Sequence, residues 1–134
     1  MDTDALVINQ LDDGQKLIDH LLASGFEVTA ACWLKTSNDG KWFLYIASPI
    51  VDAEGITMAY RRLNPLVRAM PEPFWIDPFE IKLIGSSHPI ARDVLNIHVR
   101  APGPRVCPIR WGGIQLGDVS IEGVYLYPIP VSTP

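Results

Sequence analysis

The stretch VTAACWLKTSNDGKWFLYIASPI, residues 28–50, decides the fold of this chain. Two β-prone apolar runs flank Ser37-Asn38-Asp39-Gly40. An Asp-Gly pair between such runs is a strong hairpin signal, because glycine accepts the positive φ of a tight turn. We therefore expect a hairpin over residues 28–48. Pro49 ends it, because proline has no amide hydrogen to donate to a sheet.

Both faces of this expected hairpin are apolar. In the first strand Trp33 points away from Cys32, and in the second Leu44 points away from Phe43 and Tyr45. Apolar residues on both sides are typical of strands that are covered on both sides. The hairpin is therefore expected in the middle of a sheet.

Composition bounds the class of protein. The chain has 134 residues, of which 48% are hydrophobic and 19% are charged, compared with about 25% charged in ordinary soluble domains. This length fits a single domain, residues 1–134, with a sizeable core. The formal net charge is −4 and the sequence shows no basic stripe, so we expect no nucleic-acid binding.

The sequence indicates a cytoplasmic protein. Its N-terminus is acidic and lacks the basic region of a signal peptide. Its longest uncharged apolar run, Trp42–Val51, is too short to cross a bilayer, so we expect no membrane association. The two cysteines, Cys32 and Cys107, are too few for a disulfide framework, which favours reduced thiols.

Helical spacing of apolar residues predicts a helix over about residues 12–23, with Gly25 after its end. Asp52 is the expected N-cap of a second helix, which Asn64-Pro65 either interrupts and restarts or kinks. A third helix is expected to begin at Pro89, with Ser87 or His88 as its cap.

Further strands are expected after the second helix. Residues 79–84 alternate as a half-exposed strand with Phe79 facing inward. Residues 95–100 fit either the end of the third helix or a strand, while residues 105–116 resemble a bulged edge strand and residues 119–127 a last strand. These elements predict an α+β fold: an antiparallel sheet of about five strands around the central hairpin 28–48, with the helices packed mainly on one face.

The expected helices cover only one face of the hairpin. Leaving large apolar side chains bare is costly, because burying one contributes about 1.5–3 kcal/mol. We therefore expect a protein partner or a second copy of the chain to cover the other face. The interface residues expected from this reasoning are Trp33, Phe43 and Tyr45.

The sequence offers no strong catalytic or metal-binding motif. His20, His88 and His98 lack the spacing of metal ligands, so neither a metal nor another cofactor is expected. The neighbours Ser86 and Ser87 fit a helix cap better than a nucleophile, which needs a base brought close in space.

One polar set fits an anion site. If the chain is extended there, Asn96, His98 and Arg100 project from one side, not far along the chain from His88. A solvated face is the ordinary interpretation of the same residues. The leading hypothesis is therefore a non-enzymatic interaction or accessory module that self-associates or binds a protein. The alternative is an anionic-ligand binder or modest enzyme with a site near His88, His98 and Arg100.

Overall fold

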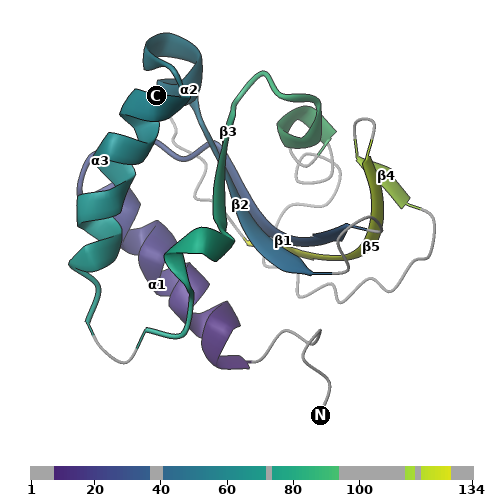
Figure 1. Cartoon of the computed structure of the whole chain (residues 1–134), viewed down its shortest axis with the longest axis horizontal. Coiled ribbons are helices and arrows are strands. Elements are labelled where there is room, and N and C mark those ends of the chain that lie inside the picture. Colours follow the sequence, from purple (N-terminus) through teal and green to yellow (C-terminus); the bar gives the residue numbers. More distant parts are fainter. Residues whose placement is uncertain (1–7, 37–40, 72–73, 94–113, 117–118, 128–134) are drawn as a thin grey trace.

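The computed structural model describes residues 8–36, 41–71, 74–93, 114–116 and 119–127 (Figure 1). In chain order the elements are α1 (Ile8–Ala23), β1 (Ala30–Thr36), β2 (Trp42–Ser48), α2 (Pro49–Glu54), α3 (Ile56–Arg68), a 3-10 turn η1 (Pro78–Glu80), β3 (Ile81–Gly85), β4 (Ile114–Leu116) and β5 (Val119–Leu126). Residues 89–93 are also helical. Over the described residues, no helix combines the length and apolar character that a membrane span requires.

The strands form one sheet in the order β3-β2-β1-β5-β4. Strand β1 pairs antiparallel with both β2 and β5, and β4 pairs antiparallel with β5. Strand β2, however, pairs in parallel with β3, from Leu44 opposite Ile81 to Ser48 opposite Gly85. The overall class is α+β, but the prediction of an antiparallel sheet is wrong, because the sheet is mixed.

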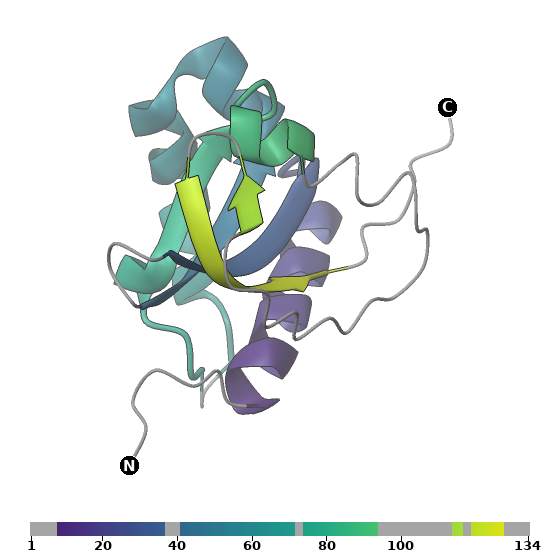
Figure 2. The same ribbon diagram turned by 90° about the vertical axis from the view of Figure 1, so that its right-hand side faces the viewer.

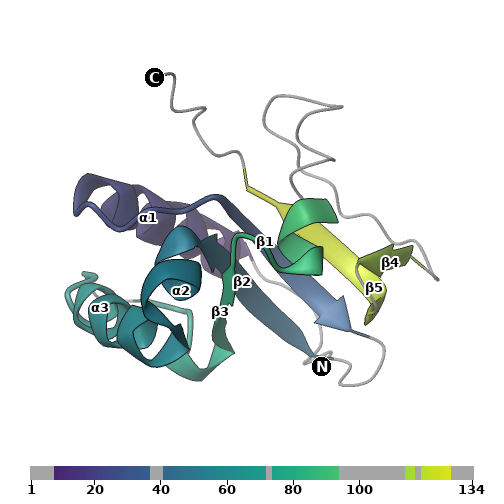
Figure 3. The same ribbon diagram turned by 90° about the horizontal axis from the view of Figure 1, so that it is seen from above.

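The parallel pair has a physical cause in the connection between its strands. Two adjacent antiparallel strands can be joined by a tight turn, whereas adjacent parallel strands need a crossover of a dozen or more residues. Between β2 and β3 the chain runs through α2 and α3 before it returns to the sheet (Figures 1 and 3). The helical pattern after Pro49 was the available signal for this crossover.

One face of the sheet packs on α1 and α3 (Figure 1). The buried cluster on this face combines residues of both helices with alternate residues of the strands. Its members include Leu17, Ile18, Leu21, Ala31, Trp33, Leu44, Ile46, Ala59, Leu63, Val67, Ile81 and Leu83. Trp33 and Leu44 are completely buried in this cluster, which contains neither Cys32 nor Phe43, so the expected orientation of these side chains is confirmed.

The other face of the hairpin is also largely buried within the chain. Ala30, Cys32 and Ala47 are each only 2% exposed, and Leu34 is completely buried. Residues 89–93 lie on this side, where Ile90 and Ala91 line a very small gap together with Ala30, Cys32, Tyr45 and Ala47 (Figures 1 and 3). The expectation that the chain's helices cover a single face is therefore corrected.

Some local boundaries depart from the sequence prediction. Helix α1 begins at Ile8, earlier than the expected start near residue 12. Helix α2 is capped by Ser48, whose hydroxyl accepts a hydrogen bond from the Ile50 amide at 3.2 Å, and not by Asp52. Of the two alternatives at Asn64-Pro65, the interruption is excluded, because α3 is a single helix with Pro65 inside it. Phe79 belongs to η1 and is 90% exposed, so its predicted inward position is wrong.

Tyr127 joins the end of β5 to β1 and α1. Its hydroxyl accepts a hydrogen bond from the Trp33 indole at 2.8 Å and donates one to the Leu11 carbonyl at 2.8 Å. Its backbone amide donates to the Ala31 carbonyl at 3.1 Å. The side chain is 1% exposed, and burial raises the pKa of Tyr127 above its ordinary value. The phenol therefore remains a neutral donor at physiological pH.

Gly14 makes room for this phenol. A Cβ atom at Gly14 would lie 2.0 Å from the Tyr127 hydroxyl oxygen, closer than any real contact. Glycine inside a helix costs about 1 kcal/mol relative to alanine. Glycine at this position lowers the intrinsic stability of α1 but allows the Tyr127 ring to pack closely against the helix.

Substitution of Tyr127 by Phe is expected to destabilise the protein by about 1–3 kcal/mol, because the buried Trp33 N–H loses its partner. Gly14→Ala is expected to cost about 1–3 kcal/mol through overpacking against the same ring. In urea denaturation the double variant should lose less than the sum, because both changes disturb one contact. Full additivity would contradict the shared contact.

Candidate functional site

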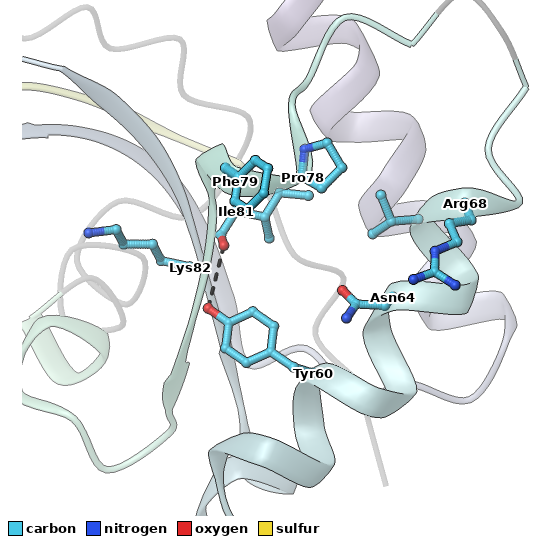
Figure 4. A pocket seen from close by; sticks show the side chains of 8 residues that line it. Tyr60, Asn64, Arg68, Pro78, Phe79, Ile81 and Lys82 are labelled. Atoms are coloured by element: carbon cyan, nitrogen blue, oxygen red, sulfur yellow. Dashed lines mark hydrogen bonds between the residues drawn. The ribbon is translucent and has the colours of Figure 1, made fainter.

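An open groove of about 570 Å³ lies between α3 and the segment that leads into β3 (Figure 4). We call it the α3–β3 groove. One wall comes from α3 and the other from η1 and β3. Its lining residues are Tyr60, Asn64, Val67, Arg68, Pro78, Phe79, Ile81 and Lys82.

Helical spacing explains the wall on α3. Tyr60, Asn64 and Arg68 are four residues apart, which places them along one side of the helix. The buried stripe Ala59, Leu63 and Val67 runs beside them and holds α3 against the sheet. The burial of one stripe thus aims the neighbouring polar stripe at the groove.

The opposite wall is a short turn fixed by its own side chains. The Asp77 carboxylate accepts a hydrogen bond from the Phe79 amide at 2.9 Å, and the Glu80 carboxylate accepts one from the Asp77 amide at 2.9 Å. This reciprocal capping box, with Pro78 at its start, restricts the backbone of η1. Phe79 is thus presented to solvent from a fixed backbone.

Trp75 is a second exposed aromatic residue of the same segment. Its side chain is 55% exposed, while its backbone amide donates a hydrogen bond to the Asp13 carboxylate. Asp13 belongs to α1 and is buried. The loop before η1 is therefore tied to the domain through its backbone.

Tyr60 closes the edge of the sheet that borders the groove. Its hydroxyl donates a hydrogen bond to the Ile81 carbonyl at 3.4 Å (Figure 4) and accepts one from the Leu83 amide at 3.0 Å. Strand β3 lies at the edge of the sheet, where free backbone groups would invite another strand. The tyrosine occupies two of these groups and so opposes strand addition.

The groove offers the guanidinium of Arg68, which only donates hydrogen bonds, and the Asn64 amide, whose N–H donates and whose C=O accepts. Its lining includes Asn64 and Arg68 but no carboxylate. Helix α3 carries Arg61, Arg62 and Arg68 and no acidic residue. Arg62 pairs with Glu54 at 3.1 Å, whereas no ion pair joins Arg68 to a carboxylate of the described residues.

Lys82 lines the groove, but its ammonium group lies outside it. Its Nζ lies 4.2 Å from the centre of the Phe43 ring, a cation–π contact. Figure 4 shows the Lys82 side chain directed away from α3. Arg68 is therefore the cation that the groove itself presents.

Of the four residues expected to form an anion site, the structure describes only His88. His88 is exposed and its Nδ1 accepts a hydrogen bond from the Ile90 amide at 3.1 Å, which is the capping role that its position before Pro89 indicated. Asn96, His98 and Arg100 lie outside the described residues. Ser87 donates to the Asp52 carboxylate at 2.7 Å, so it is not paired with His88 in a nucleophile–base arrangement.

The three residues expected at an interface lie on opposite faces of the hairpin. Trp33 is completely buried against the helices, so it offers no surface to a partner. Phe43 and Tyr45 are partly buried on the opposite face. Among the described residues, no three histidine, cysteine or acidic side chains gather as they would around a metal ion.

Comparison of the chain with models of protein families, with curated proteins and with solved structures gives no match. A function must therefore be argued from the residues themselves. Sequence reasoning missed the groove because Phe79 alternates with polar neighbours like a buried strand residue. The signal that identifies η1 is Asp77-Pro78 followed by Glu80, a capping-box pattern.

Removing the Tyr60 hydroxyl by Tyr60→Phe is expected to destabilise the protein by about 0.5–1.5 kcal/mol, because two backbone groups of β3 lose a partner. Hydrogen exchange of the Leu83 amide should accelerate, while that of the Ile46 amide in β2 serves as the internal control. Unchanged protection of Leu83 would show that the phenol does not guard this edge.

Asp52 stabilises the turn after β3. Its carboxylate accepts hydrogen bonds from the Ser86 amide and the Ser87 hydroxyl. The hydrogen bond from Ser87 is the main reason that the pKa of Asp52 lies below its ordinary value. A lowered carboxyl pKa stabilises the fold above the unfolded-state pKa, and this stabilisation is lost as the pH falls through the folded-state value.

Wild-type protein is therefore expected to lose more thermal stability than Asp52→Asn when the pH is lowered below about 4. Glu27→Gln, at an exposed carboxylate, is the matched control and should follow the wild-type pH dependence. Melting curves followed by circular dichroism measure the difference. Identical acid profiles for wild type and Asp52→Asn would exclude a stabilising role for this carboxylate.

Proposed function

We propose that this domain is a non-enzymatic interaction module, an accessory protein whose docking surface is the α3–β3 groove with Phe79 on its wall. The observation that carries the proposal is the 90% exposure of a phenylalanine held on a capped turn. Aromatic anchors of this kind dominate the binding energy of many protein interfaces.

The energetics favour binding by this residue. Burying a phenylalanine side chain contributes about 1.5–3 kcal/mol. Because the capping box already fixes the backbone of η1, little conformational entropy is lost when Phe79 enters a partner. Burial of the exposed Phe79 ring by a partner would therefore contribute favourably to the free energy of binding.

The composition of the groove supports binding over catalysis. Its lining holds no histidine, cysteine, serine or carboxylate, the groups that usually serve as nucleophile or general base. The Tyr60 hydroxyl is engaged by backbone groups of β3. What the groove offers is apolar surface, an amide and a guanidinium.

The partner proposed here is another protein, and a second copy of the chain is the alternative occupant. The second face of the hairpin, which the sequence predicts to be uncovered, is largely buried and gives no reason to expect a partner. Association is instead expected because Phe79, on the wall of the groove, is exposed to solvent. We also propose a cytoplasmic location, supported by the free thiol of Cys32.

Site-specific photocrosslinking in cells tests the proposal. A photoreactive phenylalanine analogue at position 79 is expected to capture one defined protein, whereas the analogue at Met58, an exposed α3 residue outside the groove lining, should not. The purified partner should then bind Phe79→Ala about 10–100-fold more weakly than wild type, from the value of one buried phenylalanine.

Controls separate the outcomes. Met58→Ala should bind the purified partner like wild type, and both variants should keep the wild-type melting temperature because both side chains are exposed. Capture of the chain itself, with mass rising in light scattering, would identify a homo-oligomer. Equal affinity of Phe79→Ala and wild type would overturn the proposal.

A further inference from the structure

The two walls of the α3–β3 groove differ in chemistry. Asn64 and Arg68 extend from α3 on one side, while Phe79 and Pro78 form the other side (Figure 4). A ligand lying between them would meet hydrogen-bond donors along one edge and apolar surface along the other. The groove therefore favours a ligand with hydrogen-bond acceptors on one side and an apolar group on the other.

The donor wall suits a carboxylate. A guanidinium presents its N–H groups as a planar fork that matches both oxygens of a carboxylate. Asn64 lies one helical turn before Arg68 and adds an amide donor on the same stripe. Because the groove lining lacks acidic residues, nothing within it competes for these donors.

The two carboxylates of η1, the turn that forms part of the second wall, and of its cap are already engaged. Asp77 accepts from the Phe79 amide and Glu80 from the Asp77 amide, so both serve the turn itself. Glu54 at the end of α2 pairs with Arg62 of α3. The protein has a net charge of −4, yet the only charged residues of α3 are arginines. Charge complementarity therefore points to an acidic occupant.

Tyr60 blocks part of the edge of β3, and this limits how a bound peptide can be recognised. Tyr60 holds the Leu83 amide and the Ile81 carbonyl, so an extended chain cannot pair with these groups of β3 unless the phenol moves. Recognition then depends on side chains and not on an added strand. The open groove also suits a segment of polypeptide lying across it.

We propose that the α3–β3 groove binds an acidic peptide segment of a partner protein, with a carboxylate on Arg68 and Asn64 and an apolar side chain against Phe79. This inference rests on the proposed function, since it names the partner chemistry of the same surface. Phe79 supplies affinity, and Arg68 supplies selection, because exposed charges discriminate between partners more than they tighten binding.

A phage-displayed library of random peptides, selected on the intact protein, is the test. Peptides that bind wild type and fail to bind Phe79→Ala are expected to be enriched in Asp and Glu beside an aromatic or aliphatic residue. Synthetic peptides from this set should bind Arg68→Glu at least about tenfold more weakly, the equivalent of about 1.4 kcal/mol. Arg68→Gln should show a smaller loss in the same direction.

Arg61→Glu is the matched control, because it makes the same change of charge on the same helix outside the groove lining. It should bind the peptides nearly as wild type does. Replacing the peptide carboxylate by a lysine should restore binding to Arg68→Glu, a result that misfolding could not produce.

The outcomes separate the two proposals. Peptides that depend on Phe79 but show no acidic enrichment and no response to Arg68→Glu would overturn this inference and leave the interaction module intact. Equal losses in Arg61→Glu and Arg68→Glu would also overturn it, because only general charge would then matter. A library that yields no Phe79-dependent binder would overturn the proposed function and the inference together.

Discussion

The Tyr127 hydroxyl holds together the three elements around which the domain is built. It accepts the indole hydrogen of Trp33 on β1 and donates to the Leu11 carbonyl of α1, from a position directly after β5. A buried indole N–H without a partner is costly, so the three elements have one favourable arrangement. Gly14 permits that arrangement because any side chain there would occupy the place of the phenol. With α1 fixed on the sheet in this way, one face of the hairpin becomes the core on which α3 also packs.

The position of α3 then creates the groove. The crossover from β2 to β3 passes through α3, so the helix lies beside the edge strand that it leads into (Figures 1 and 2). Tyr60 bonds to backbone groups of β3 and fixes this spacing. The turn η1 supplies the second wall, with Phe79 left to solvent.

Much of the fold was predictable from local pattern. The two-sided apolar hairpin was placed correctly in the interior of the sheet, since β1 and β2 each pair with a strand on both sides. The end of α1 at Ala23 is confirmed, with Gly25 at a positive φ of 84°. The candidate site was not predictable in the same way. His88 proved to be a capping residue, and the groove joins Arg68 to Phe79 across a loop whose path no periodicity reveals.

The sequence by itself determined the hairpin around residues 37–40 and the end of α1 before Gly25, because those features depend on neighbours a few positions away along the chain. It also determined that the hairpin is apolar on both sides. Only the tertiary structure decided what covers the second side, where residues 89–93 lie against β1 and β2. It likewise decided that β3 runs parallel to β2 and that Phe79 stays outside. Strand direction and exposure depend on how distant segments meet, and alternation of apolar residues is the same for a strand of either direction.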